Sequence, residues 1–242
     1  MEITSLSLSV RDFGCNVVFA PELQKPVEIV NFAEYFTVSV QDGRLKIEQS
    51  APYVRKVTNL TDFFTSRRVL IRLQQSAFEL LTVNCCAYVQ INKLQLQQCS
   101  VKAVAGSVRL HDCKVNKLLL KGNAASFNCE TLGEMENVNV NVNRSSLHFS
   151  ELSVREAEFN GDCSACNFHN VQITEKLNLE LCNTSFSWND PPQEANVDVS
   201  NDNSVVRYYG RLLHSGRSTC QNDDVLRLNI RSNNVNSSVK LG

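Results

Sequence analysis

A pair of apolar residues separated by one polar residue recurs in this chain every 19 or 20 positions. The six pairs are Val89/Ile91, Val108/Leu110, Phe127/Cys129, Leu147/Phe149, Cys166/Phe168 and Phe186/Trp188. Alternation of apolar and polar residues is typical of a short β-strand with one buried face. A fixed period near 20 indicates that such strands stack, each period upon the one before.

Each period holds three such apolar units, as in Val108/Leu110, Cys113/Val115 and Leu118/Leu120. We therefore predict an all-β fold, a single-stranded β-solenoid with 19–20 residues and three short strands per coil. A small residue precedes the first strand of each coil, which suits a tight corner where backbones approach closely. These residues are Ser107, Ser126, Ser146, Ala165 and Ser185.

The 242 residues fit one elongated domain spanning 1–242. The regular coils occupy 69–188, and the strand-like segments within 1–50 are expected to cap the first edge of the stack. Residues 51–68 and 189–224 break the pattern, so we predict a loop at each and closing strands in the last part of 189–242. In the coil that contains Phe127, Glu134 stands where an apolar residue is expected, which indicates a one-residue bulge.

Composition argues against several classes of function. The net charge is −1, with 24 basic and 25 acidic residues, so there is no basic excess for nucleic-acid binding. No apolar run is long enough for a transmembrane segment. The first residues lack the features of a signal peptide. We expect a cytoplasmic protein if the chain is complete, and a cell-surface protein if a leader or a membrane-anchored partner exists.

The order of these features resembles a bacterial family of β-solenoid domains known as the putative-adhesin family, a domain of unknown function. The resembling parts are VSVQDGRLKIEQ, VLIRLQQSAFELLTVNC, GSVRLHDCKVNKLLLKGNAASFNC and the closing LRLNIRSNNVNSSVKL. The resemblance covers most of the chain and implies no catalytic residues. A second resemblance, through SVRLHDCKV, is to cytosolic β-helices of the cyclase-associated and tubulin-cofactor type.

Ten cysteines are many for this length. Four fall on positions that the period assigns to the interior, where a free thiol behaves as a small apolar group. They are Cys99, Cys113, Cys129 and Cys166. Cys163 and Cys166 form a CxxC pair, and Cys182 lies one coil later, so these three are candidate metal ligands or a redox pair. Zinc prefers four ligands and no second pair follows, so we expect neither a metal nor another cofactor.

Binding residues are expected in the irregular segment after residue 188, because loops on a rigid scaffold commonly carry binding. The candidates are Tyr208, Tyr209, Arg211 and Arg217, since Tyr and Arg often anchor interfaces. The alternative is an ordinary loop packed on the side of the stack.

The pattern supports two functions. The first is a non-catalytic structural or interaction protein, adhesin-like, with a protein or glycan partner. The alternative is a carbohydrate-active β-helix enzyme, which requires two carboxylates about 5–10 Å apart. Exposed positions of the third strand mix charges and amides, which favours a surface ladder over a catalytic pair. They are Gln98, Lys117, Asn137, Glu156 and Lys176.

Overall fold

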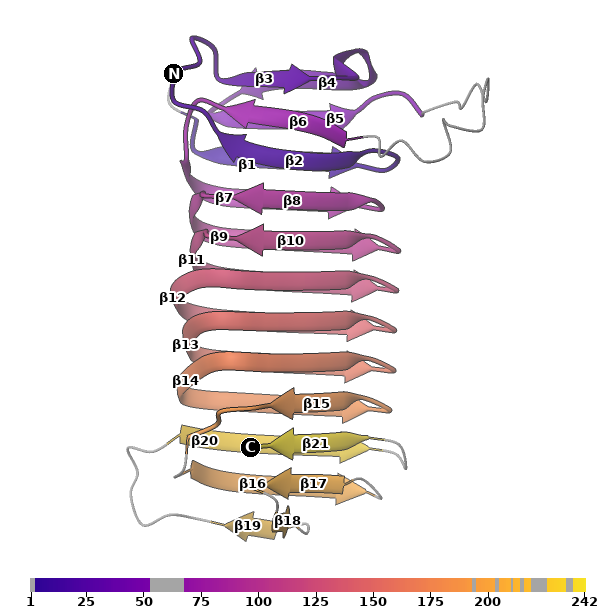
Figure 1. Ribbon diagram of the computed structural model, residues 1–242, viewed down its shortest axis with the longest axis vertical. Coiled ribbons are helices and arrows are strands. Elements are labelled where there is room, and N and C mark those ends of the chain that lie inside the picture. The colour runs from indigo at the N-terminus through magenta and orange to yellow at the C-terminus, as the bar shows by residue number, and fades with distance from the viewer. Residues whose placement is uncertain are drawn as a thin grey trace.

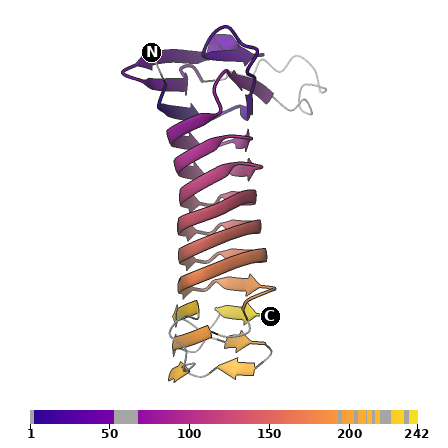
Figure 2. The same ribbon diagram turned by 90° about the vertical axis from the view of Figure 1, so that its left-hand side faces the viewer.

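The computed structural model describes residues 3–52, 68–192, 195–202, 205–209, 211–213, 216–218, 226–233 and 237–242. Within this part the fold is all-β, and a 3-10 turn at Ala33–Tyr35 is the one helical element. All strands belong to a single hydrogen-bonded sheet, curled into a column of layers (Figure 1, Figure 2). No helix in the described ranges is long and apolar enough to cross a membrane.

The central strands all pair in parallel with strands of the neighbouring layers. They are β8 (Tyr88–Asn92), β9 (Gln95–Val104), β10 (Ser107–His111), β11 (Lys114–Asn123), β12 (Ser126–Asn143), β13 (Ser146–Asp162), β14 (Ala165–Cys182) and β15 (Ser185–Trp188). All six predicted apolar pairs lie opposite one another, for example Phe127 between Val108 and Leu147. The register predicted from the 19–20 residue spacing is confirmed for residues 88–188.

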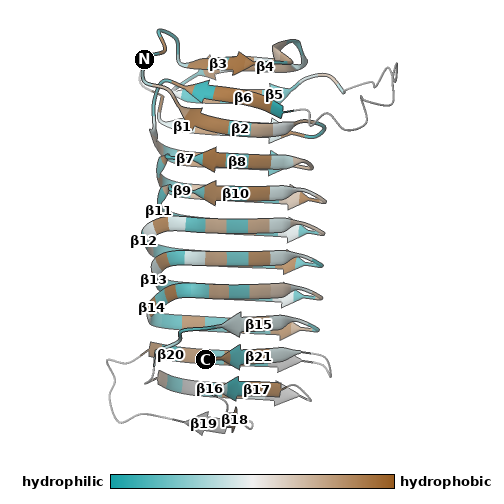
Figure 3. Cartoon of the chain, viewed as in Figure 1, coloured by the Kyte–Doolittle hydropathy of each residue, from teal (hydrophilic) through white to brown (hydrophobic). Residues whose placement is uncertain are grey.

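Apolar and polar residues alternate along these strands (Figure 3). Because successive side chains point to opposite faces, the apolar ones form one continuous core. Towards the C-terminal end the core becomes aromatic. The centre of the Phe168 ring lies 4.9 Å from that of Phe186, 5.3 Å from that of Phe149 and 6.1 Å from that of Trp188, and all three pairs are edge to face. The buried indole Nε1 of Trp188 donates a hydrogen bond of 3.0 Å to the carbonyl oxygen of Val171. Aromatic rings in this geometry contribute more than their buried area alone.

Each layer of β8 to β11 is interrupted at two turns and therefore holds two strands, whereas the layers of β12, β13 and β14 are each interrupted at one turn. Two residues per layer have positive φ, as at Asp112 (54°) and Ala124 (51°). In β12, β13 and β14 the strand continues through the turn at Thr131, Glu151 or Asn170, which also has positive φ. Consequently β12, β13 and β14 are single strands of 18, 17 and 18 residues, and the prediction of three short strands per layer is wrong for these layers.

The irregularity predicted near Glu134 is confirmed. The pairing of β12 with β13 shifts register between Glu130 and Gly133. Gly133 has a φ of 75°, a conformation that glycine adopts without strain. Gly133 lies where pairing resumes after the inserted residue, and Leu132 and Met135 remain buried on either side of it.

A column of buried hydroxyl groups links the layers at one corner, directly before the predicted small residues. Its members are Ser145, Ser164, Thr184 and Ser237, all at most 7% exposed. Each hydroxyl oxygen accepts a hydrogen bond from a backbone N–H of the preceding layer, as in Ala125 N to Ser145 Oγ (3.1 Å). Three of the hydroxyls also donate to a carbonyl two residues earlier in their own layer. The column satisfies backbone groups that the corners would otherwise leave unpaired.

The N-terminal end is closed by strands from 3–52 and 68–85. They are β1 (Ser5–Val10), β2 (Gly14–Phe19), β3 (Val27–Val30), β4 (Phe36–Gln41), β5 (Arg44–Gln49), β6 (Arg68–Leu73) and β7 (Ala77–Cys85). β1 lies between β5 and β7, and β2 lies between β6 and β8, all in parallel. β3 and β4 then cover β6 and β5 in antiparallel pairing. β3 and β4 thus pair with the outermost parallel strands, whereas β1 and β2 form an internal layer.

The C-terminal end repeats this arrangement. Its strands are β16 (Ala195–Asp202), β17 (Val205–Tyr208), β18 (Arg211–Leu213), β19 (Gly216–Ser218), β20 (Leu226–Asn233) and β21 (Ser238–Leu241). β20 pairs with both β14 and β16, and β21 pairs with both β15 and β17. The strands expected in the last part of 189–242 are present as β20 and β21, but the segment before them is not a single long loop. The described parts of 189–224 contain four strands, and the last two strands enter the stack one layer inside its end.

Candidate functional site

One side of the stack presents polar side chains in three columns, on β8, β10, β15 and the first five residues of β12, β13 and β14. We call it the polar face; it is turned to the viewer in Figure 1. Its middle column is Gln90, Arg109, Asn128, His148, Asn167 and Ser187. The predicted small residues form the first column, and Asn92, His111, Glu130, Ser150 and His169 form the last.

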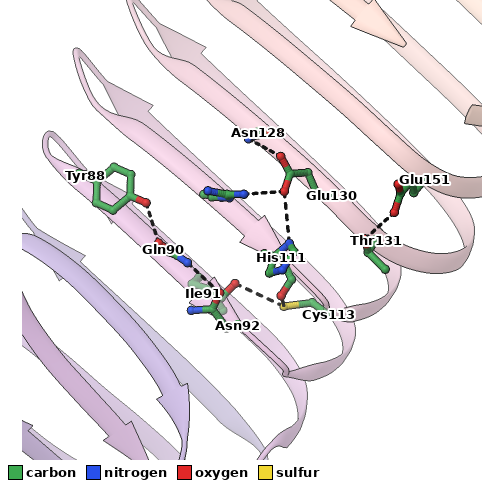
Figure 4. Close-up of polar contacts among 11 residues, drawn as sticks. Tyr88, Gln90, Ile91, Asn92, His111, Cys113, Asn128, Glu130, Thr131 and Glu151 are labelled. Carbon is green, nitrogen blue, oxygen red and sulfur yellow. Dashed lines mark hydrogen bonds and ion pairs between the residues drawn. The ribbon is translucent and has the colours of Figure 1, made fainter. Parts of the chain in front are cut away.

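Glu130 is the centre of a cluster on this face (Figure 4). Its Oε2 accepts a hydrogen bond of 2.7 Å from Arg109, and its Oε1 accepts one of 2.8 Å from Asn128 Nδ2. The Nδ1 atom of His111 lies 3.2 Å from the same carboxylate. The Arg109 hydrogen bond is the main cause that lowers the pKa of Glu130 below its ordinary value. The carboxylate is thus held as an anion, which suits a structural or ligand-positioning role and not that of a general acid.

A second chain of hydrogen bonds continues towards the N-terminal end. The Tyr88 hydroxyl donates to Gln90 Oε1 (2.7 Å), Gln90 donates to Asn92 Oδ1 (2.9 Å), and Asn92 donates to Asn16 Oδ1 (3.3 Å). The guanidinium carbon of Arg68 lies 5.6 Å from the centre of the Tyr88 ring. These contacts link the polar side chains of β8 to those of β2 and β6, three strands in all.

The Arg68 contact spans a whole strand. Gly14 of β2 pairs with Arg68 on one side, and Cys15 pairs with Val89, so Gly14 lies between Arg68 and Tyr88. Because glycine has no side chain, the guanidinium can cross this position to reach the ring. Cation–π contacts of this kind stabilise modestly at exposed sites.

We expect Glu130→Gln to remove a pH-dependent part of the stability. A carboxyl with a lowered folded-state pKa contributes stability above its unfolded pKa, and that contribution is lost as the pH falls through the folded value. At pH 7 the variant should unfold with about 1 kcal/mol less free energy, since the pair is partly exposed. Urea unfolding of both proteins at several pH values would show the difference shrink below about pH 4.

Glu134→Gln is the matched control, because this carboxylate is exposed. It should leave the free energy of unfolding within about 0.5 kcal/mol of the wild type at every pH. A difference for Glu130→Gln that stays constant from neutral to acidic pH would contradict the charged Arg109–Glu130 pair.

The three candidate cysteines do not converge on one site. Cys166 is 1% exposed and points into the core, whereas Cys163 is exposed at a corner. Burial raises the pKa of the Cys166 thiol well above its usual range, and a hydrogen bond to Asp162 raises that of Cys163. Cys182, half-buried, lies one layer from Cys163, whose N–H donates to the Cys182 carbonyl (2.9 Å). No group of three His, Cys, Asp or Glu side chains in the described part is placed to hold a metal.

The other interior thiols behave as predicted. Cys99, Cys113 and Cys129 are each at most 1% exposed, and burial is the main cause that raises the pKa of each. A protonated, inaccessible thiol is a poor nucleophile and a poor ligand. These residues therefore belong to the packing of the core.

The predicted binding tyrosines lie at the end of β17, near the C-terminal end of the stack. Their rings meet edge to face at 5.0 Å, and the hydroxyls of Tyr208 and Tyr209 donate to the carbonyls of Pro192 and Pro191. Tyr209 remains 46% exposed. Arg211 and Arg217 belong to β18 and β19, but their side chains lie outside the described part, as do residues 53–67 of the first predicted loop. The four residues are not shown to form one site.

The last parts of β11 to β14, together with β16 and β20, form another side of the stack, which we call the third side. A hollow of about 780 Å³ lies on it, lined by residues of β13, β14, β16 and β20. Glu158, Glu180 and Asp198 line it together with Lys176 and Arg231. Glu180 forms an ion pair of 3.5 Å with Arg231, and Glu158 accepts a hydrogen bond of 2.8 Å from Asn139. The hollow thus holds both carboxylates and cations, and Glu158 and Glu180 already have polar partners.

The Glu130 cluster is the feature that sequence reasoning missed. Alternation correctly turned Arg109 and Asn128 outward, but each position was considered alone. Arg109 and Glu130 are 21 residues apart, one layer plus two positions, and such diagonal neighbours are within reach of long side chains. Searching the outward positions for opposite charges at this spacing would have found the pair.

No family model matches the chain, and no curated protein matches it. A solved structure that aligns with it is described as a "putative cell adhesion protein" from Clostridium sporogenes. The alignment covers 99% of this chain and 92% of that one, with 11% identity and a TM-score of 0.31. A TM-score this low does not establish a shared fold.

Proposed function

We propose that this chain is a β-solenoid that acts without catalysis, as a structural or interaction protein that offers its long faces to a protein or glycan. The parallel pairing of residues 19 or 20 positions apart supports the solenoid class. Strands at both ends that pair in antiparallel fashion support a stack of limited length, since they interrupt the parallel ladder.

The observation that carries the proposal is the polar face with its ordered Glu130 cluster. Its side chains are held by one another on a rigid sheet, as preorganised recognition surfaces are. Glu130 is held as an anion by Arg109 and Asn128. A carboxylate with these partners can position a ligand, but it is poorly suited to donate a proton.

One observation supports the alternative function, a carbohydrate-active enzyme. Glu158 and Glu180 line the 780 Å³ hollow from adjacent layers. Their register makes them diagonal neighbours, so their backbones are about 7–8 Å apart, within the range for paired carboxylates. Their bonds to Asn139 and Arg231 argue for the surface ladder instead.

A panel of soluble polysaccharides separates the two functions. The full chain would be incubated with each polymer, and both retention of the protein and polymer length would be measured, by affinity electrophoresis and size-exclusion chromatography. The proposal predicts retention by at least one polymer with no change in its length. Shortening of a polymer, abolished by Glu158→Gln or Glu180→Gln, would contradict the proposal and establish the enzyme.

A further inference from the structure

The polar face differs in charge from the rest of the stack. Among the described outward positions of β8, β10, β15 and the first parts of β12 to β14, Glu130 is the one carboxylate. It is already paired with Arg109. The remaining ionisable groups in the middle and last columns are imidazoles, those of His111, His148 and His169. The third side carries both signs throughout, as in Lys121, Glu158 and Lys176.

The polar face also lacks the apolar surface that protein partners use. The large apolar residues exposed in the described part are Phe19, Val38, Val40, Val104, Val205, Tyr209 and Leu212. None of them belongs to the strands of the polar face. The centres of protein–protein interfaces are enriched in aromatic and apolar groups. The polar face therefore suits a hydrogen-bonding polymer better than a folded protein.

Charge density selects among polymers. Double-stranded DNA carries about one charge every 1.7 Å and requires many lysines and arginines. The polar face offers one guanidinium that is already paired, three imidazoles, and amides and hydroxyls such as Asn167 and Ser187. A polymer with well-spaced negative charges and many hydroxyls matches these few ionisable groups and many hydrogen-bonding side chains.

We propose that the polar face binds a linear acidic polysaccharide whose carboxylates are separated by neutral, hydroxyl-rich parts, as in polyuronates. The inference rests on the proposed function and names its ligand class. The exposed imidazoles of His148 and His169 donate ring N–H hydrogen bonds to the carboxylates of the polymer. Asn167, which lies between His148 and Ser187, hydrogen-bonds to sugar hydroxyls with its amide. The ordered Arg109–Glu130 cluster holds the neighbouring layer rigid.

Substitutions at Asn167 test the proposal through charge alone. Asn167 is exposed in the middle column, so Asn167→Asp and Asn167→Lys change the local charge without disturbing the core. Asn141 is the matched control: it is an exposed asparagine of β12 on the third side, between Lys121 and Asn160. Asn141→Asp and Asn141→Lys change the net charge equally, so nonspecific attraction affects both pairs alike.

The probe is sodium polygalacturonate in affinity electrophoresis, with its methyl ester as the neutral comparison and double-stranded DNA as a second polyanion. We expect retention by polygalacturonate, about fivefold weaker for Asn167→Asp and about fivefold stronger for Asn167→Lys, as one charge at contact distance gives. Retention of the Asn141 variants by polygalacturonate should differ little from that of the wild type. The methyl ester should retain the wild-type protein only weakly. Thermal unfolding would verify that all variants fold.

Absent retention by polygalacturonate, equal retention by its methyl ester, or equal effects at Asn141 would overturn the inference. Tighter retention by DNA would overturn it in favour of nucleic acid. These results leave the proposed non-catalytic function standing, whereas shortening of the polymer contradicts that function and not the location of binding.

Discussion

Phe168→Ala should lower the free energy of unfolding by about 4 kcal/mol, as truncation of a buried phenylalanine typically does. Phe168 is 4% exposed and contacts the rings of Phe149, Phe186 and Trp188, so alanine leaves a cavity shared by three layers. Trp188 is the single tryptophan of the chain, and its fluorescence reports on this cluster directly. Unfolding in urea followed by Trp188 fluorescence would measure the change.

Phe19→Ala is the matched control, because Phe19 is 39% exposed at the end of β2. It should cost less than about 1 kcal/mol. If Phe168→Ala does not fold, Phe168→Leu keeps most of the volume and should cost about 1.5 kcal/mol. Equal losses at Phe168 and Phe19 would contradict the central position of the aromatic cluster.

Thr184→Val should cost about 2 kcal/mol, because it removes a buried hydroxyl without changing the shape of the side chain. The Thr184 Oγ1 accepts a hydrogen bond from Ser164 N (3.3 Å) and donates one to the carbonyl of Cys182 (2.9 Å). Valine leaves the Ser164 N–H buried without this acceptor. Chemical unfolding would give the cost, and amide hydrogen exchange should become faster at Ser164.

Thr184→Ser retains the hydroxyl and should remain within about 1 kcal/mol of the wild type. Ser185→Ala removes the neighbouring exposed hydroxyl and should cost less than about 0.5 kcal/mol. If valine at 184 were as stable as serine there, the buried hydroxyl column would have no stabilising role.

The central layers could be predicted from the sequence because one rule operates there. Side chains alternate between core and solvent, and each layer repeats the apolar positions of the last, so Val108, Phe127 and Leu147 identify their own register. The same rule located the interior thiols and the irregularity near Glu134. The rule overlooked the hydroxyl column, because nothing in the sequence distinguishes a buried serine at a corner from an exposed one.

The ends could not be predicted in this way. β1 and β20 lie between layers that are distant from them in sequence, so the spacing of 19 or 20 does not apply. Short strands such as β17 also hide among the asparagines, aspartates and prolines of 189–224. The polar cluster was missed for a related reason: Arg109 and Glu130 meet along a diagonal, which a column-by-column reading does not compare.

The account depends on the parallel register of the layers, since this register creates the polar face. Amide–amide NOEs in deuterated, amide-protonated protein test it most directly. The account predicts cross-peaks between residues 19 or 20 apart, connecting Asn128 with Arg109 and His148, and His148 with Asn167. Cross-peaks that instead follow antiparallel hairpins between consecutive segments of 88–188 would contradict it.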